Sequence, residues 1–242
     1  MSDLKILLRF YIDSGINTFF EKKGCDSIVY DSQDKRSIDD YLKDDEIETY
    51  ITDSLDNICQ DIRNFNQCDL IKTAINTVIY DGNPRARIML IGEAPGASED
   101  EKGIPFCGQS GKLLDNILKS INLSRIDDVF ITNTVFWRPP GNRRPTAVEI
   151  SLCKPLLERI IAFINPKIII LVGSTAVESV LNIKAIPMSE LRQNKYIYLN
   201  NRINNQIQTV TIFHPSYLLR QPSQKKAMWF DMLKIKKIIH NI

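Results

Sequence analysis

The sequence lacks a long apolar run. Within its 242 residues, no uninterrupted apolar stretch has the length of about 18 that a membrane-spanning helix requires. In the N-terminal segment MSDLKILLRFYIDSG, Asp3 and Arg9 interrupt the apolar residues and no small-residue cleavage site follows, so a secretory signal is not expected. We therefore expect a protein that neither crosses a membrane nor is secreted, with the cytoplasm as its compartment.

Cysteine is also scarce, and no two cysteines are closely spaced. The sequence has five, at positions 25, 59, 68, 107 and 153. Secreted domains that are held by disulfides usually carry an even number of cysteines at short, regular spacings. An odd number of scattered cysteines indicates free thiols in a reducing compartment instead.

Charge is unevenly distributed, although the formal net charge is only +2. Residues 1–60 hold 7 Lys/Arg and 14 Asp/Glu, a net charge of −7, which leaves a net charge of +9 to residues 61–242. Two interpretations of the basic part stay open. It is an ordinary domain beside a solvated acidic arm, or it is a domain that binds a polyanion.

Residues 1–60 form the first of two predicted parts, an acidic N-terminal extension that we expect to be helical. Apolar residues recur at helical spacing over 4–11 and again over 47–55. The polar and acidic residues 24–40 between them have no clear period. The extension carries no catalytic motif, and a docking arm, a lid and a partly disordered tail all stay open as its role.

Residues 61–242 form the second predicted part, a domain of alternating strands and helices. Amphipathic stretches predict helices over 112–122, from the capping-box spacing Thr146–Glu149, after Gly173 and after Pro222. Apolar, β-rich runs predict four strands, over 87–92, 128–134, 167–173 and 208–214. We therefore expect an α/β fold with three layers, α/β/α, around a central, mostly parallel four-stranded sheet.

Unusual residues stand where each predicted strand ends, which is where open parallel sheets bind their ligands. The segments that follow the four strands are GEAPGASEDEKGIPFCGQSGKLL from Gly92, Asn133 with RPPGNRRP from Arg138, the pair Gly173–Ser174, and HPSYLLR from His214. Singly, a terminal asparagine, a His-Pro turn or a phenylalanine is common as a cap, a turn or a core residue. Together at one edge of a sheet, they predict a pocket for a flat, polar ligand.

In these motifs the sequence resembles the family 4 uracil-DNA glycosylases, the thermophile-type enzymes that usually carry an iron–sulfur cluster. The resemblance extends from about Cys68 to the C-terminus, with Cys107 where the family usually has valine. It implies the uracil-DNA glycosylase fold and a hydrolase of base excision repair. The implied substrate is uracil-containing DNA, single- or double-stranded, from which deoxyuridine is flipped out and its N-glycosidic bond hydrolysed to leave an abasic site.

The resemblance also implies which residues bind the base. Phe106 would stack on the flipped uracil, and Gly92 would line its pocket. Asn133 would read the uracil edge, because its amide offers both a donor and an acceptor. Glu99 would lie near C5 of the base and help to exclude the methyl group of thymine.

Catalysis and DNA contact are implied for further residues. His214 would stabilise the charge that builds on uracil O2, and Glu93 would stabilise the sugar cation and orient the attacking water, with Asn133 holding the base. Leu218 and Leu219 would fill the gap that the flipped base leaves. The residues implied to contact the DNA are Arg138, Arg143, Arg144, Ser174, Ser216, Leu218, Leu219, Arg220, Lys225 and Lys226.

The sequence departs from the family at the iron–sulfur cluster, which the family binds through four cysteines. Cys68 and Cys153 match two of these positions, whereas Phe65 and Trp137 occupy the other two. Neither aromatic side chain can bind iron, and clusters of this kind need about four thiolates. We therefore expect no cluster, no other metal and no other cofactor, with the two aromatic rings filling the vacated volume.

Two alternative functions stay open. The acidic extension and the missing cysteines slightly favour a DNA-binding or replication-associated module with the same fold and little or no catalysis. A glycosylase for another base, such as hypoxanthine or xanthine, fits Asn133 and Glu99 less well than uracil does. We further expect a monomer with no membrane partner, and the acidic extension is the place where a protein partner would bind.

Overall fold

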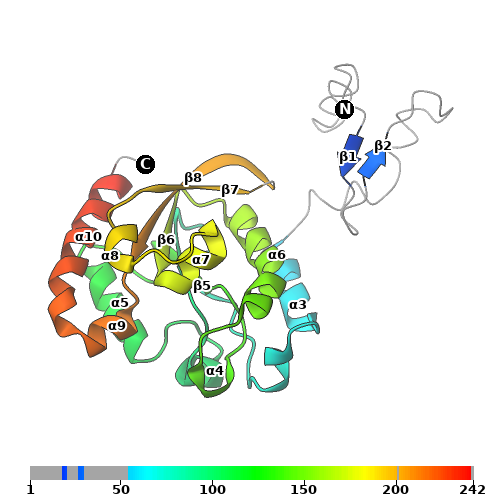
Figure 1. The fold of residues 1–242 in the computed structure, drawn as a ribbon, viewed down its shortest axis with the longest axis horizontal. Helices are drawn as coiled ribbons and strands as arrows, with labels where there is room; N and C mark the ends of the chain where they lie inside the picture. The colour runs from blue at the N-terminus through cyan, green and yellow to red at the C-terminus, as the bar shows by residue number, and fades with distance from the viewer. Residues whose placement is uncertain (1–17, 21–26, 30–53, 201, 241–242) are drawn as a thin grey trace. The chain divides into compact units, whose positions relative to one another are not determined.

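The computed structural model describes residues 18–20, 27–29, 54–200 and 202–240. The chain divides into two units, Met1–Asp53 and Ser54–Ile242. In the first unit the described residues form two short antiparallel strands, β1 (Thr18–Phe20) and β2 (Ser27–Val29), rather than a helix (Figure 1). The helix predicted over 4–11 and most of that predicted over 47–55 lie outside the described residues.

The second unit begins before residue 61, the predicted domain boundary. Helix α3 (Leu55–Asn64) belongs to it, and the boundary falls inside this helix. The Ser54 hydroxyl caps the helix by accepting a hydrogen bond from the Asn57 backbone N–H at 3.1 Å. Ile58 and Ile62 are fully buried in the core of the second unit, so hydrophobic packing ties α3 to this unit.

Six strands form the central sheet, in the order β3-β5-β4-β6-β8-β7. The four predicted strands are confirmed as its parallel centre: β4 (Ile88–Gly92), β5 (Val129–Asn133), β6 (Ile168–Val172) and β8 (Ile203–Ile212). The predicted number of four was wrong, because an antiparallel strand lies at each edge, β3 (Tyr80–Gly82) and β7 (Tyr196–Asn200). The sheet is therefore mixed.

Helices cover both faces of the sheet, which confirms the predicted three layers. In β4, Met89 and Ile91 pack with α3, α6 and α7, whereas Ile88 and Leu90 pack with α5, α9 and α10. Figure 1 shows the same division. Every residue of β4, β5 and β6 is buried, as expected for parallel strands covered on both faces. The remaining helices are α4 (Ala97–Lys102), α5 (Gln109–Lys119), α6 (Ala147–Ile164), α7 (Ser174–Leu181), α8 (Met188–Leu191), α9 (Pro215–Arg220) and α10 (Lys225–Ile239), with 3₁₀ turns at Asp69–Lys72, Pro140–Asn142 and Pro222–Gln224.

The strand register brings the chemistry-bearing strand ends to one edge of the sheet. Gly92 of β4 pairs directly with Asn133 of β5. Val172 of β6 pairs with Ile212 of β8, so Gly173 and His214 follow at the same edge. None of the helices in the described part of the chain is long and apolar enough to cross a membrane.

Candidate active site

Gly92, Asn133 and Phe106 meet at the carboxyl end of β4. A Cβ atom at Gly92 would lie 2.4 Å from Asn133 Oδ1 and 2.5 Å from Phe106 Cζ, so only glycine allows this approach. Asn133 and Phe106 are both almost fully buried. The close contact places an amide group and an aromatic ring around one point, as the strand-end motifs predicted.

Phe106 also faces the imidazole of His214. The two ring centroids are 5.7 Å apart with an interplanar angle of 29°. The backbone of Phe106 has a φ of +51°, a left-handed conformation that is costly for a bulky residue. A Cβ atom at Gly111 would lie 1.6 Å from the Phe106 carbonyl oxygen, so α5 packs directly against this strained backbone.

Arg125, which the sequence did not suggest as a site residue, fixes the backbone of Phe106 from the other side. Its Nη2 donates to the Phe106 carbonyl at 2.8 Å, and its Nη1 donates to the Pro105 carbonyl at 3.2 Å. The same guanidinium group forms ion pairs with Asp115 at 2.7 Å and Asp81 at 2.9 Å. The two carboxylates orient a guanidinium group that in turn holds the strained residue, so Arg125 positions the aromatic ring.

His214 has a defined tautomer. The Ser216 backbone N–H, which can only donate, points to His214 Nδ1 at 3.1 Å, and the Ser216 hydroxyl lies 2.8 Å from the same nitrogen. Nδ1 must therefore accept, which places the proton of a neutral ring on Nε2. Burial, and secondly the positive charge of Arg220, lower the pKa of His214 to about 4, against the opposing effect of Glu99. The ring is neutral at physiological pH and still has one N–H to donate.

The carboxylate of Glu93 is oriented by Thr175, another residue that the sequence did not suggest. The Thr175 hydroxyl, buried at the start of α7, donates to Glu93 Oε2 at 2.5 Å. The Thr134 hydroxyl donates to the Glu93 carbonyl oxygen at 2.6 Å and holds the backbone. Among the described residues, no side chain or backbone group hydrogen-bonds Glu93 Oε1, so this oxygen is the one available to a substrate or a water molecule.

Replacing Thr175 by valine should lower kcat about ten-fold, because the buried hydroxyl that orients Glu93 is lost, and about 1.4 kcal/mol of barrier corresponds to a factor of ten. Valine has the same shape, so the melting temperature should change little. Thr175→Ser keeps the hydroxyl and should retain most of the activity. An unchanged kcat in Thr175→Val would show that the Thr175 hydroxyl does not orient Glu93 for catalysis. Single-turnover kinetics on the substrate that the sequence resemblance implies measure the effect.

Glu99 organises the loop between β4 and α5. Its Oε2 accepts from the Gly96 backbone N–H at 3.1 Å, and its Oε1 accepts from the Gly108 N–H at 2.8 Å. Both oxygens thus serve the loop that carries Phe106. The predicted contact of Glu99 with C5 of a base stays a prediction, and the structure adds a supporting role that its position in the motif did not indicate.

Three predicted phosphate-binding arginines already have partners inside the protein. Arg143 forms a bidentate ion pair with Glu149, at 2.6 and 2.9 Å, which lowers the pKa of Glu149 to about 2. Arg144 donates to Glu178 at 2.5 Å. Arg138 donates to the Asn142 side chain at 2.7 Å. These guanidinium groups hold the loop before α6 and its neighbours in place.

The two residues of the predicted wedge differ in exposure. Leu218 is fully buried in the core below α9, whereas Leu219 is 42% exposed. The entry of either side chain into DNA stays a prediction, and the exposed Leu219 needs no rearrangement for it. Arg220 and Ser174 are exposed, and Ser174 is the first residue of α7. Their predicted contacts with DNA stay predictions. Ser216 contacts His214, so its hydroxyl serves the imidazole.

The four positions of the family's cluster do not fit an iron–sulfur cluster. Cys68 and Cys153 are buried, and their hydrogen bond lowers the pKa of Cys68 to about 7 and, together with burial, raises that of Cys153. Phe65 and Trp137 supply stacked rings, 5.9 Å apart at 15°, in place of thiolates. In the described part of the chain, no group of three His, Cys, Asp or Glu side chains is arranged to hold a metal ion.

Comparison with known proteins places this site in a family. The model of the Uracil DNA glycosylase superfamily matches residues 79–234, which include Glu93, Phe106, Asn133 and His214. The chain is 37% identical over 187 residues to the type-4 uracil-DNA glycosylase of Archaeoglobus fulgidus, covering 77% of this chain and 94% of that protein. It is 39% identical over 191 residues to the enzyme of the same name from Saccharolobus solfataricus, covering 77% and 87%. It is also 30% identical over 151 residues to the DNA polymerase of Bacillus phage SP01, covering 62% of this chain but only 16% of the polymerase.

Proposed function

Because the chain belongs to the uracil-DNA glycosylase superfamily, as a uracil-DNA glycosylase that hydrolyses N-glycosyl bonds, we propose that Phe106, Asn133, His214 and Glu93 carry out its reaction without an iron–sulfur cluster. The single observation that carries this proposal is the contact of Asn133 and Phe106 around Gly92, with the His214 ring facing that of Phe106. An aromatic face, an amide and a neutral imidazole donor match the face, edge and leaving-group oxygen of a flipped uracil.

Base recognition rests on Phe106 and Asn133. Flipping deoxyuridine out of a duplex costs about a few kcal/mol, part of which stacking on Phe106 recovers. The Asn133 amide donates to one uracil carbonyl and accepts from the ring N3–H. Cytosine has an exocyclic donor where uracil has an acceptor, so the same amide leaves a polar group unpaired against cytosine. The buried position of Asn133 makes that mismatch costly.

Leaving-group stabilisation rests on His214. As the N-glycosyl bond breaks, negative charge builds on uracil O2, and a neutral Nε2–H donates a hydrogen bond to it. A donor that is aimed in advance at developing charge acts in the transition state without reorganisation. Ser216 keeps the proton on Nε2 and the ring in place.

Stabilisation of the sugar rests on Glu93. The sugar becomes cationic as the bond breaks, and a carboxylate held by Thr175 through one oxygen presents the other to the cation or to the attacking water. The uracil anion leaves as the N-glycosyl bond breaks, water adds at C1′ and loses a proton, and an abasic site and, after protonation of the anion, free uracil result. Leu219 fills the gap in the duplex, while the exposed Arg220, Lys225 and Lys226 contact phosphates.

Iron should be absent from the purified protein, because two cysteines and two aromatic side chains occupy the family's four cluster positions. Anaerobically purified protein should show no absorbance band near 400 nm and no stoichiometric iron by elemental analysis. Chelator treatment should leave turnover unchanged. Stoichiometric iron that is lost together with activity would contradict this part of the proposal.

A cleavage assay tests the proposed site. Purified protein is incubated with oligonucleotides that contain U·G, U·A or single-stranded uracil, and abasic products are revealed by alkaline cleavage. Release of uracil by the wild type and its loss in Asn133→Ala, with DNA binding retained, is the expected result. The similarity to part of a phage DNA polymerase favours one alternative, a replication-associated binding module. DNA binding without cleavage of any substrate would support that module, and release of hypoxanthine or xanthine but not of uracil would reassign the base.

The proposed working form is a monomer in the cytoplasm. One DNA-facing edge is sufficient for base flipping, and the four cysteines that the structure describes are free thiols, in keeping with a reducing compartment. A protein partner for the acidic extension is part of the proposal, on the basis of its charge alone.

A further inference from the structure

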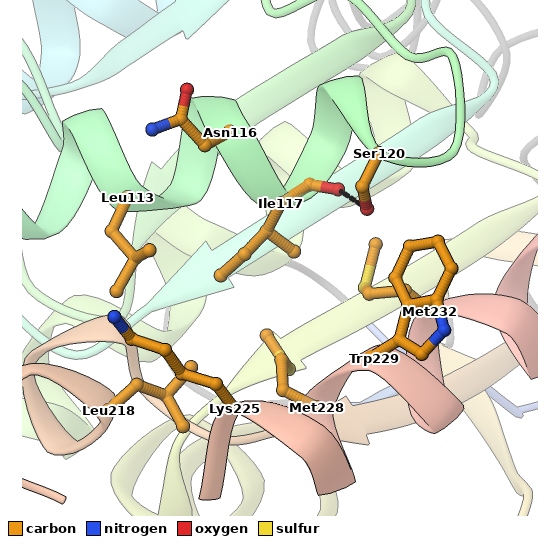
Figure 2. Close-up of a pocket in the computed structure, with 9 residues that line it drawn as sticks. All are labelled: Leu113, Asn116, Ile117, Ser120, Leu218, Lys225, Met228, Trp229 and Met232. Carbon is orange, nitrogen blue, oxygen red and sulfur yellow. Dashed lines mark hydrogen bonds between the residues drawn. The ribbon is translucent and has the colours of Figure 1, made fainter. Parts of the chain in front are cut away.

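An apolar groove lies outside the uracil pocket, between α5 and α10. Figure 2 shows its two walls facing each other. Its apolar lining consists of Leu113, Ile117, Leu218, Met228, Trp229 and Met232, around a cavity of about 170 Å³. None of the proposed catalytic side chains lines it. The groove is therefore not explained by uracil release.

The two walls have the spacing of helical ridges. On α5 the lining residues Leu113, Asn116, Ile117 and Ser120 recur every three or four positions, and α10 presents its own row from Lys225 to Met232 in the same way. The Ser120 hydroxyl donates to the carbonyl of Ile117 in its own helix at 2.6 Å and offers no donor to the groove. Two facing rows of mostly apolar side chains fit a third helix that has an apolar face.

Trp229 is the strongest sign that the groove is used. It forms one wall and is 43% exposed, which leaves a large apolar surface in water. Tryptophan is enriched among residues that dominate binding energy, and methionines such as Met228 and Met232 adapt to the shape of a bound apolar side chain. The partner that fits this lining has large aliphatic or aromatic anchors.

The rim of the groove specifies the charge of that partner. Lys225 lines the groove, and Lys112, Lys119 and Lys226 are each next in sequence to a lining residue; we call these four the rim lysines. All four are exposed, and none forms an ion pair with a described residue. The acidic side chains of these two helices are both neutralised, Asp115 by Arg125 and Asp231 by Arg192. The following list gives all charged residues of the two helices: Lys112, Asp115, Lys119, Lys225, Lys226, Asp231, Lys234, Lys236 and Lys237. The uncompensated charge is positive throughout, so it attracts an acidic partner.

We propose that this groove binds an acidic amphipathic helix of a partner protein. Apolar anchors at i, i+3 or i+4, and i+7 enter between α5 and α10. Carboxylates on the flanks of the helix meet Lys112 and Lys119, since Lys225 and Lys226 are already proposed as contacts to DNA phosphates. DNA fits less well, because its phosphates need donors along their path, and only three of the nine lining residues, Asn116, Ser120 and Lys225, are polar. Leu218 lies in the floor and Leu219, the proposed wedge, follows it on α9, so the partner would sit directly beside the DNA-binding edge.

Fluorescence anisotropy tests the proposal with the full chain and a labelled synthetic peptide. The peptide is a helix of about four turns with leucine and phenylalanine at i, i+3, i+4 and i+7 and glutamate elsewhere. Micromolar binding is expected, with a blue shift of the Trp229 emission. Trp229→Ala should weaken binding about ten-fold or more. Phe230→Ala is the matched control, because Phe230 is a neighbouring aromatic residue of α10, 52% exposed, that does not line the groove.

The outcomes separate this proposal from the others. Uracil release and the melting temperature should be the same in both variants as in the wild type, since neither residue belongs to the catalytic site. No peptide binding, or equal losses in the two variants, would overturn the proposal. Displacement of the peptide by a uracil-free single strand, with DNA binding weakened by Trp229→Ala, would assign the groove to DNA instead. Self-association that Trp229→Ala abolishes would assign it to a second copy of the chain.

Discussion

Replacing His214 by alanine should lower kcat for uracil release about 10²–10³-fold, the range observed when one donor to a developing oxyanion is removed. The reason is the geometry at the N-terminus of α9, where Ser216 makes Nδ1 an acceptor and leaves Nε2–H as the only donor of the ring. KM should change little, because the hydrogen bond strengthens only as charge builds on the leaving group. Single-turnover rates on a uracil-containing oligonucleotide measure this effect.

The pH dependence gives an independent check on the same residue. Because the pKa of His214 is lowered to about 4, the ring stays neutral and kcat should not fall with the ordinary histidine titration near pH 6.5. The unfolded chain takes up the proton first as pH falls, so the free energy of unfolding should decrease between about pH 6.5 and pH 4. His214→Ala should remove that part of the decrease.

A kcat in His214→Ala within a factor of about two of the wild type would refute the role of His214 as the donor.

Replacing Arg125 by methionine should both destabilise the protein and weaken uracil recognition. Asp81 and Asp115 lose their partner, and because both are about one-third exposed the expected cost is about 2–3 kcal/mol, below the 3–5 kcal/mol of a fully buried pair. Phe106 loses the two hydrogen bonds that hold its loop, so KM should rise more than kcat falls. Thermal unfolding and steady-state kinetics measure the two effects.

Two further variants distinguish the effect of Arg125 on the position of Phe106 from its effect on the stability of the protein. Arg125→Lys keeps the charge but not the planar fork, so it should restore part of the stability while KM stays high. Arg159→Met is a matched control. The Arg159 side chain is equally exposed, at 16%, and forms an ion pair with Asp61 at a distance of 2.8 Å. This pair does not belong to the uracil pocket. It should lower stability without a change in KM. If KM rises no more in Arg125→Met than in Arg159→Met, Arg125 has a structural role only and does not position Phe106.

The central strands could be predicted because each is covered on both faces, so each reads as a continuous apolar run. The edge strands could not. β3 has only three residues, Tyr80–Gly82, and β7 exposes Ile197 and Leu199 to solvent, so neither has the pattern of a buried strand. For the same reason a helical prediction for the N-terminal extension did not anticipate β1 and β2, which are also three residues each.

Site residues at the ends of predicted strands could be predicted from the sequence. Site residues that act through contacts with residues distant in the sequence could not. Asn133, His214 and Phe106 stand out because they follow predicted strands. Thr175 and Arg125 act through residues far along the chain, and no local pattern records such a contact. The only available signal for Thr175 was its place directly after Gly173–Ser174 at the third strand end. The burial of Leu218 could not be predicted, because the rotation of α9, which turns this side chain into the core, is set by packing.

The internal partners of Arg138, Arg143 and Arg144 have a consequence for how DNA binding responds to ionic strength. Affinity falls with salt because cations condensed on the phosphates are released when a protein cation replaces them. A phosphate that takes Arg143 from Glu149 frees a carboxylate, which then attracts a cation of its own, so the net release is small. Lys225, Lys226 and Arg220, which have no such anion to give up among the described residues, should therefore dominate the salt dependence, and the arginine-rich loop should contribute less than its charge suggests.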